Sequence, residues 1–487
     1  MDFMKSIDAQ PIPSEDADDA WRLWIALTEQ AARSSELEAE LASLKSSRSW
    51  RLTAPLRAAM RLLRPVGASG AKRCAFGADG IAPDRALLAA PWVSKVLAAD
   101  DGVSPRWLVD VTMLDSEDLG AGVQRVTRRL LAEMLFSPPE RCRIEPVRLV
   151  QGRYHHARRF LARFLGVPAA LLGPDDAVQP RAHDRLLGLD FCRGRATELR
   201  SALEALRAAG TEASLVVHDV LPLSDPQWFP DEVVRDYESW LAVLSACGDR
   251  ALCVSSDTAM RLRDALAERG LAEPACGLAV FPLGADMPPA PDAEVLPAGS
   301  QAARVLTVGT LEPRKGHAQA LAAFELLWSR GCDVEWIIAG REGWRVARLA
   351  EALRSHPEAG RRLRWVEGPD DRVLASLYRR CDLLLAPSQG EGFGLPIVEA
   401  GKLNLDLLVR DIPVFREVAG DAATYFEGSS AEAIADAISA WLDRRAEANT
   451  GARHWATWAQ SAEALKSIVA ASRRPDSGSA RNGMETA

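Results

Sequence analysis

Two short segments of the sequence combine glycines with charged side chains in a way that suits a phosphorylated ligand. The first is VGTLEPRKGH at residues 308–317, in which Arg314 and Lys315 are adjacent. A guanidinium and an ammonium group are suited to the oxygen atoms of a diphosphate. Gly309 lets the backbone approach a ligand, and a helix beginning near Gly316 would attract an anion through its N-terminus. Taken alone, the segment favours a turn between a strand and a helix that carries two solvated cations.

The second segment is SQGEGFGLPIVEA at residues 388–400, in which seven residues separate Glu391 from Glu399. Glu391 lies among glycines, and Pro396 suits the first turn of a helix. Glu399, one turn inside that helix, is placed to accept hydrogen bonds from a vicinal diol such as a ribose. The backbone amides that would point at a ligand above the helix are those of Phe393, Gly394 and Leu395. Either acid alone is compatible with a solvated surface glutamate, but the combination is more specific.

Two weaker candidates lie in the first half of the chain. His218 follows the apolar run Ser214–Val217, so it is predicted to lie at a strand end. A hydrogen-bonded structural histidine is as compatible with this position as a functional one. The segment LGAGV at residues 119–123 has Gly120 and Gly122, which would admit a phosphate or a sugar close to the backbone. Many turns between a strand and a helix need such glycines for other reasons.

Apolar runs of strand length alternate with helical segments along most of the chain, and this alternation would position the candidate residues. The predicted strands are Trp107–Val111, Ser214–Val217, Ala251–Val254, Leu278–Phe281, Val305–Val308, Val334–Ala339, Leu363–Val366, Leu383–Ala386 and Leu405–Val409. Predicted helices include Val123–Met134 and Glu232–Leu244. Alternating strands and helices imply parallel sheets covered on both faces. We therefore predict an α/β fold with two Rossmann-like, doubly wound domains facing a cleft, at residues 106–298 and 299–472, separated by a proline-rich stretch.

The N-terminal part of the sequence has a different character. Residues 1–19 are acidic and contain prolines, which predicts a disordered tail. Residues 20–75 are predicted to form a helical extension that a linker at residues 76–105 joins to the first domain. Its first helix has an a/d heptad pattern at Leu23, Leu27, Gln30, Ser34, Leu37, Leu41 and Leu44. This pattern favours either a short coiled coil with another chain or a helix docked on its own protein. Residues 473–487 are predicted to be a disordered tail.

Residues 48–73 carry seven positive charges and no acidic residue. On the helix predicted after Pro55, apolar residues share one face and arginines form an adjacent stripe, with Trp50 just before it. A basic amphipathic helix with an interfacial aromatic residue favours binding to an anionic membrane surface. The alternative is a solvated arginine stripe on a helix that packs against the body of the protein.

The bulk composition excludes several classes of function. A net charge of -8 over 487 residues argues against nucleic-acid binding. The eight cysteines form no C-x-x-C pair and have no metal-ligand spacing, so we expect a reduced, intracellular protein without a metal centre. Neither a secretory signal nor an apolar stretch of about 20 residues is evident.

The two glycine-rich segments, together with GDAATYFEGSS at residues 420–430, resemble the donor-domain signatures of family-4 retaining glycosyltransferases, which have the GT-B fold. The spacing of Glu391 and Glu399 is similar to that family's E-x7-E motif. The segments LVDVTMLDSEDLGAGVQRVTRRLL, at residues 108–131, and VHDVLPLSDPQWFP, at residues 217–230, are similar to acceptor-domain segments of bacterial members that build surface polysaccharides. Many of those members are mannosyl- or rhamnosyltransferases. The resemblance covers residues 106–470.

The resemblance implies that the first glycine-rich segment binds the diphosphate of a nucleoside diphosphate sugar, the donor. Lys315 and Arg314 would bind it and stabilise its charge as the glycosidic bond breaks. Gly309 and Thr310 belong to the same donor-binding loop, and the loop at Gly122 would lie against the diphosphate. Thr310 departs from the family pattern, since many relatives have arginine there, and Arg314 would supply the missing charge.

The resemblance also implies positions for the sugar and the ribose. Glu391 and the amides of residues 393–395 would hold the transferred sugar, and Glu399 would hold the ribose. His218 would contact the sugar from the opposite domain, which makes His218, Glu391 and Lys315 the catalytic candidates. A helix at Trp455–Val469 would cross back to the N-terminal domain. Retention would follow from front-face attack, so no carboxylate nucleophile is expected.

The partners implied by the resemblance are a sugar nucleotide, with GDP-mannose as the best candidate, and a lipid-linked glycan acceptor. No cofactor or metal is expected, because no D-x-D motif lies at a predicted strand end. The predicted location is the cytoplasmic face of a bacterial inner membrane, bound through residues 48–73. Two alternatives remain open at this point: a sugar-nucleotide epimerase of the same architecture, and an inactive scaffold in a polysaccharide assembly complex.

Overall fold

The computed structural model describes residues 102–116, 122–165, 167, 169, 172–288, 296–297, 302–444 and 454–471. The predicted tails, the helical extension of residues 20–75 and most of the linker lie outside the described residues. Residues 98–157 and 176–487 belong to one compact unit, and residues 158–175 belong to another. Within the latter, the helix α8 (Arg158–Leu165) begins where Asp175 accepts hydrogen bonds from the backbone amides of Arg158 and Arg159.

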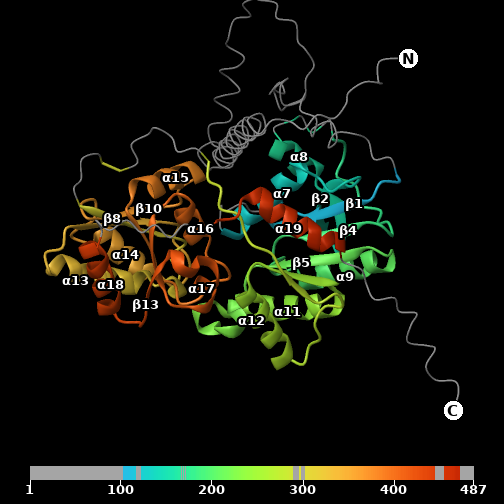
Figure 1. Ribbon diagram of the computed structural model, residues 1–487. Helices are drawn as coiled ribbons and strands as arrows, with labels where there is room; N and C mark the ends of the chain where they lie inside the picture. Colours follow the sequence, from blue (N-terminus) through green and yellow to red (C-terminus); the bar gives the residue numbers. More distant parts are fainter. Residues whose placement is uncertain are drawn as a thin grey trace, which may run out of the picture. The chain divides into compact units, whose positions relative to one another are not determined.

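The larger unit contains two separate sheets (Figure 1). The first has seven strands in the order β3-β2-β1-β4-β5-β6-β7, all parallel except β3, which pairs antiparallel with β2. Its strands are β1 (Arg106–Asp110), β2 (Arg143–Val150), β3 (Arg153–His156), β4 (Arg185–Gly188), β5 (Glu212–Val217), β6 (Arg250–Cys253) and β7 (Leu278–Val280). The antiparallel edge strand β3 was not predicted from the sequence, and neither were β2 and β4.

The second sheet has six parallel strands in the order β10-β9-β8-β11-β12-β13. They are β8 (Ala303–Val308), β9 (Val334–Ala339), β10 (Leu363–Val366), β11 (Leu383–Ala386), β12 (Asp406–Arg410) and β13 (Thr424–Phe426). Of these strands, only β13 was not predicted. The predicted α/β fold with two Rossmann-like sheets is therefore confirmed.

Helices follow most strands. Those in the half of the chain that forms the first sheet are α6 (Thr112–Ser116), α7 (Gly122–Phe136), α9 (Ala196–Ala208), α10 (Leu221–Ser224), α11 (Asp231–Cys247) and α12 (Ser256–Glu268). Those in the second half are α13 (His317–Ser329), α14 (Ala347–Ser355), α15 (Asp371–Arg380), α16 (Leu395–Lys402), α17 (Pro413–Ala419), α18 (Ala431–Arg444) and α19 (Trp458–Ala471). Short 3-10 helices lie at Pro226–Trp228, Pro313–Lys315 and Gly420–Ala422.

Alternating side chains of the second sheet enter two different hydrophobic clusters. Val305 of β8 and Trp336 of β9 pack with α13 and α18, whereas their neighbours Leu306 and Ile337 pack with α15, α16 and α17. A strand whose successive side chains are all buried must have a covered surface on each face. The apolar runs that predicted these strands therefore have a direct structural cause, and the doubly wound arrangement follows from it.

The last described helix returns to the first half of the chain. α19 packs against α7, and the two helices lie side by side in Figure 1. Its Lys466 donates a hydrogen bond of 2.9 Å to the carbonyl of Ser137, and Ser461 donates one of 2.6 Å to the carbonyl of Pro282. The predicted crossing helix is therefore present, but it begins at Trp458 instead of Trp455.

The stacked pair Phe324–Trp336 tests the packing of the second sheet, because its ring centroids lie 4.9 Å apart in a fully buried core. We expect Phe324→Ala to lower the free energy of unfolding by about 3–5 kcal/mol, since it leaves a cavity between α13 and β9. The matched control is Glu325→Ala, because the Glu325 side chain is 54% exposed on the same helix. Chemical denaturation should show a change of no more than about 0.5 kcal/mol for that control. Equal effects of the two substitutions would contradict the packing described.

Candidate functional site

The loop after β8 is held in place by glycine. The chain passes from β8 through the 3-10 turn Pro313–Lys315 to Gly316, which has a left-handed φ of 73° and precedes α13. A Cβ atom at Gly316 would lie 2.4 Å from the carbonyl oxygen of Pro387, in the loop after β11. Because only glycine permits both this φ and this close approach, the two candidate loops can lie against each other.

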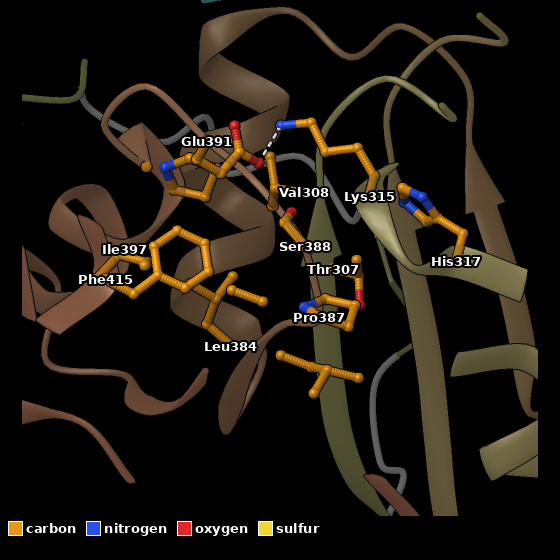
Figure 2. Close-up of a pocket in the computed structure, with 14 residues that line it drawn as sticks. Thr307, Val308, Lys315, His317, Leu384, Pro387, Ser388, Glu391, Ile397 and Phe415 are labelled. Carbon is orange, nitrogen blue, oxygen red and sulfur yellow. Dashed lines mark hydrogen bonds and ion pairs between the residues drawn. The ribbon is translucent and has the colours of Figure 1, made fainter. Parts of the chain in front are cut away.

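Glu391 joins these two loops through a pair of cations. Lys315 Nζ lies 2.5 Å from Glu391 Oε1, and Arg314 Nη1 lies 2.8 Å from Glu391 Oε2 (Figure 2 shows the lysine contact). Arg314 Nη1 also donates to the carbonyl of Gly390 at 2.7 Å, and the Arg314 carbonyl accepts from the amide of Gln389 at the same distance. The structure therefore brings together three residues that the sequence had singled out separately.

The charges in this cluster are buried and balanced. Burial alone would raise the pKa of Glu391, but the neighbouring Arg314 and Lys315 reverse that effect and lower it to about 2. Arg314 has a second acidic neighbour, since its Nε forms an ion pair of 3.0 Å with Glu312. Burial raises the pKa of Glu312, and this effect outweighs that of the two cations. Acidic side chains thus pair with the two cations that an incoming anion would need.

His317 is a site residue that the sequence analysis did not single out. With Lys315, Ser388 and Glu391 it lines a cavity of about 10 Å³, which is room for about one water molecule (Figure 2). The His317 side chain is buried, and among the described residues neither ring nitrogen has a hydrogen-bond partner. Burial and the adjacent Lys315 lower its pKa to about 3, so the imidazole is neutral. Its place directly after Lys-Gly, at the first position of a helix, was the available signal.

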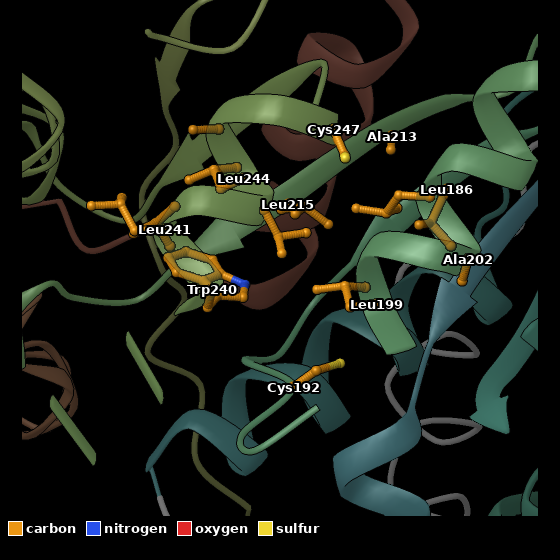
Figure 3. Packing of buried hydrophobic residues seen from close by; sticks show 14 of the residues in the cluster. Leu186, Cys192, Leu199, Ala202, Ala213, Leu215, Trp240, Leu241, Leu244 and Cys247 are labelled. Atoms are coloured by element: carbon orange, nitrogen blue, oxygen red, sulfur yellow. The ribbon is translucent and has the colours of Figure 1, made fainter. Parts of the chain in front are cut away.

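His218 is positioned by the core beneath β5. Leu215 of that strand packs among Trp240, Leu241 and Leu244 of α11, as Figure 3 shows. The strand ends at Val217, so His218 emerges at its carboxyl end, as predicted. His218 Nε2 forms a hydrogen bond of 2.8 Å with the carbonyl of Leu189, which fixes the ring, and burial lowers the His218 pKa.

The loop that contains Glu391 also contacts the end of β5. A Cβ atom at Gly392 would lie 1.8 Å from the carbonyl oxygen of His218, so this position admits only glycine. The Gly392 carbonyl accepts hydrogen bonds from Ser255 at 2.6 Å and from Thr258 at 3.0 Å, both near the start of α12. His218 and Glu391, which come from different sheets, are thereby brought into the same neighbourhood.

Glu399 lies in a second charged cluster. Its side chain is 1% exposed, and its Oε1 lies 2.5 Å from Arg125 Nη2 of α7. Its Oε2 accepts a hydrogen bond of 2.8 Å from the hydroxyl of Tyr378 on α15. Glu399 is not among the residues that line the cavity beside Lys315. Arg125 and Tyr378 were missed, although Arg125 lies in the predicted helix Val123–Met134.

The remaining predicted residues flank these clusters. Gly309 has a φ of 142°, and a Cβ atom there would lie 3.5 Å from Lys315 Nζ, so the lysine side chain runs across it. Gly394, with a φ of 103°, precedes the first residue of α16, Leu395, next to Phe393. Gly122 is the first residue of α7 and is exposed, but residues 117–121 of its loop lie outside the described residues. Thr310 is half-buried after β8.

The described residues also bear on metal binding and on membrane crossing. No cluster of three or more histidine, cysteine, aspartate or glutamate side chains in them is suited to hold a metal ion. Likewise, none of the helices in the described part of the chain combines the length and the apolar character needed to cross a membrane.

The neutral His317 makes stability depend on pH. Because its pKa is lowered to about 3 from 6.5, the unfolded chain binds a proton more readily, and stability is lost as the pH falls through this range. At pH 5 the loss is about 2 kcal/mol relative to pH 8. We expect His317→Gln to remove this part of the pH dependence, measured by chemical denaturation at both pH values. An unchanged difference between the two pH values would show that His317 is not buried as a neutral ring.

Comparison with known proteins finds a family similarity in the second half of the chain. Residues 292–455 match the protein family described as "Glycosyl transferases group 1". The serotype-specific mannosyltransferase WbdA of Escherichia coli is 38% identical over 374 residues, which cover 74% of this chain and 45% of that protein. The O-antigen chain mannosyltransferase B of Escherichia coli is 32% identical over 133 residues, which cover 26% of this chain and 34% of that protein. The chain thus spans less than half the length of either relative.

Among solved structures, sucrose-phosphate synthase from Thermosynechococcus elongatus aligns with a TM-score of 0.49 and 17% identity, covering 75% of this chain and 95% of that one. The family match includes β8 to β13 and both glycine-rich segments. Over residues 292–455, the chain is thus similar to the glycosyl transferases group 1 family.

Proposed function

We propose that this protein transfers a mannosyl residue from GDP-mannose to a lipid-linked saccharide during the synthesis of a surface polysaccharide. The contact of Lys315 and Arg314 with Glu391 is the observation that carries the proposal, because it concentrates charge between the starts of α13 and α16. The choice of mannose rests on the two Escherichia coli relatives, both of which are mannosyltransferases by name.

In this proposal Lys315 and Arg314 bind the donor diphosphate. The diphosphate replaces the carboxylate of Glu391 as the partner of Lys315, and the N-terminus of α13 adds a favourable dipole. Negative charge develops on the leaving nucleoside diphosphate as the sugar–phosphate bond breaks, and cations fixed in a buried site stabilise that charge strongly. Arg314 supplies a second cation next to Lys315, which the neutral Thr310 does not. The proposed step includes no metal ion.

The transferred sugar is held from both sheets in the same proposal. Glu391, released from Lys315, accepts hydrogen bonds from sugar hydroxyls, and the amides of residues 393–395 donate to sugar oxygens. His218 contacts the sugar from the end of β5, and Glu399 accepts hydrogen bonds from the ribose. The acceptor oxygen forms the new glycosidic bond on the face that the phosphate leaves, and the acceptor proton passes to the leaving phosphate oxygen. Configuration at the anomeric carbon is therefore retained.

The acceptor and the location form a further part of the proposal. A lipid-linked acceptor confines the reaction to a membrane surface, and residues 48–73 carry the basic amphipathic pattern that binds anionic lipids. The enzyme would work on the cytoplasmic face of the inner membrane, where the sugar nucleotide is present. The heptad pattern at residues 23–44 is available for pairing with another chain.

Substitution of Lys315 tests the transfer reaction. We expect Lys315→Ala to lower the rate of mannosyl transfer from GDP-mannose by about 100- to 1,000-fold, since a buried cation no longer stabilises the leaving diphosphate. Lys402→Ala is the control, because Lys402 forms a more exposed ion pair with Asp286. The measurement follows radiolabelled mannose into lipid-extractable glycan. Equal rates for both variants would reject the role of Lys315, and conversion of the sugar nucleotide without acceptor would favour an epimerase instead.

Deletion of residues 1–75 tests the membrane part of the proposal. We expect the shortened protein to lose binding to vesicles that contain anionic phospholipid, because the basic segment at residues 48–73 is removed. Co-sedimentation with anionic and with neutral vesicles measures this directly. Unaltered sedimentation of the shortened protein with anionic vesicles would reject the assignment.

A further inference from the structure

Two arginines of α7 reach side chains that belong to the second half of the chain. Arg125 and Arg129 are one turn apart, so they extend from the same side of the helix. Arg125 Nε lies 2.9 Å from Asp371 Oδ1, and Arg129 Nη2 lies 3.2 Å from Asp371 Oδ2. Only Arg125 also reaches Glu399, at 2.5 Å from Nη2 to Oε1. The two arginines thus share one acidic partner and differ in the other.

Both oxygens of Glu399 are occupied in this cluster. Arg125 contacts one oxygen, and the hydroxyl of Tyr378 donates to the other at 2.8 Å. The Glu399 side chain is 1% exposed and that of Arg125 is 14% exposed, so the arginine covers the carboxylate. A ligand hydroxyl cannot reach Glu399 in this arrangement unless Arg125 moves away.

Arg125 has a second acidic partner, Asp371, in addition to Glu399. Its Nη2 forms a hydrogen bond with Glu399, whereas its Nε forms an ion pair with Asp371 without an aligned hydrogen bond. If Arg125 leaves Glu399, Asp371 remains as a partner for the guanidinium. Since a buried charge left without any partner is strongly unfavourable, this second acid makes the exchange feasible.

We propose that Arg125 blocks Glu399 in the donor-free protein and that the ribose of an arriving nucleotide displaces it. The proposal rests on the proposed function, because it takes Glu399 as the acceptor for the ribose hydroxyls. Arg125 is then a positioning residue, because its contact with Glu399 determines the fraction of protein molecules that can bind the ribose. The apparent affinity for a nucleotide is reduced by the fraction of molecules in which Glu399 is blocked.

Nucleotide binding to full-length variants tests this exchange. The probes are GDP and 2′,3′-dideoxy-GDP, and isothermal titration calorimetry gives both dissociation constants. Their ratio isolates the contribution of the ribose hydroxyls, because any change in the attraction of the diphosphate affects both nucleotides alike. We expect Arg125→Gln to increase the preference for GDP by about tenfold, as it would if Glu399 is blocked in about nine molecules out of ten.

Arg129→Gln is the matched control, since Arg129 lies one turn further on α7 and contacts Asp371. We expect it to leave the preference for GDP unchanged. Arg125→Lys is a second variant, in case Arg125→Gln does not fold. Its single ammonium cannot bind Glu399 and Asp371 as the guanidinium does, so it should raise the preference by a smaller factor in the same direction.

The outcomes separate the two proposals. If Arg125→Gln leaves the preference for GDP unchanged or lowers it, the blocking role is overturned. The same holds for Arg125→Lys if only that variant folds. GDP binding itself would still support the proposed function. A wild-type protein that binds GDP and its dideoxy analogue equally, with no gain in either variant, shows that Glu399 does not hold the ribose and also overturns the proposal. Absence of binding by every variant removes the proposed function, and the role of Arg125 with it.

Discussion

The site depends on one buried carboxylate that two cations hold. Glu391 ties the loop after β11 to the loop after β8, because Lys315 binds one of its oxygens and Arg314 the other. Removal of either partner would leave a charge in a place where water cannot solvate it. The same arrangement keeps two cations in position at the start of a helix. Structural support and readiness for a ligand therefore come from the same ion pairs.

Close backbone contacts allow this arrangement, and glycine permits them. Gly316 lets the turn before α13 lie against Pro387, and Gly392 lets the loop after β11 lie against the carbonyl of His218. Neither position has space for a Cβ atom. The glycines of the two segments are thus needed to bring three parts of the chain together, in addition to any contact with a ligand.

The sequence predicted the second sheet better than the first for a physical reason. The strands β9, β10 and β11 have the bounds that were predicted, because each is mostly apolar, with Glu335 in β9 and Arg364 in β10 as the charged exceptions. In contrast, β2 includes Glu145 and Pro146, and β3 is the short polar run at an edge of the sheet, so neither has a strand's apolar pattern. Glu145 is nevertheless buried, with Arg143 and His156 as its partners.

The residues of the candidate site were likewise predicted only where a local sequence pattern marks them. Lys315 and Glu391 could be identified because each lies in a local motif whose glycines mark a loop at a strand end. The partner of Glu399 could not be identified in this way, since Arg125 is 274 residues away in the chain. The periodic pattern of a helix does not indicate which distant acidic side chain an arginine on that helix contacts. His317 was overlooked because a lone histidine at the start of a helix has no distinctive spacing.

The position of α19 has a consequence for biosynthesis. This helix, which ends at Ala471, packs against α7, which begins at Gly122. A nascent chain therefore leaves the face of α7 that contacts α19 uncovered until residues 458–471 have left the ribosome. Domains that emerge first usually fold first. Here the earlier sheet can form during translation, but its helical layer is completed only after residues 458–471 have emerged and can dock on α7.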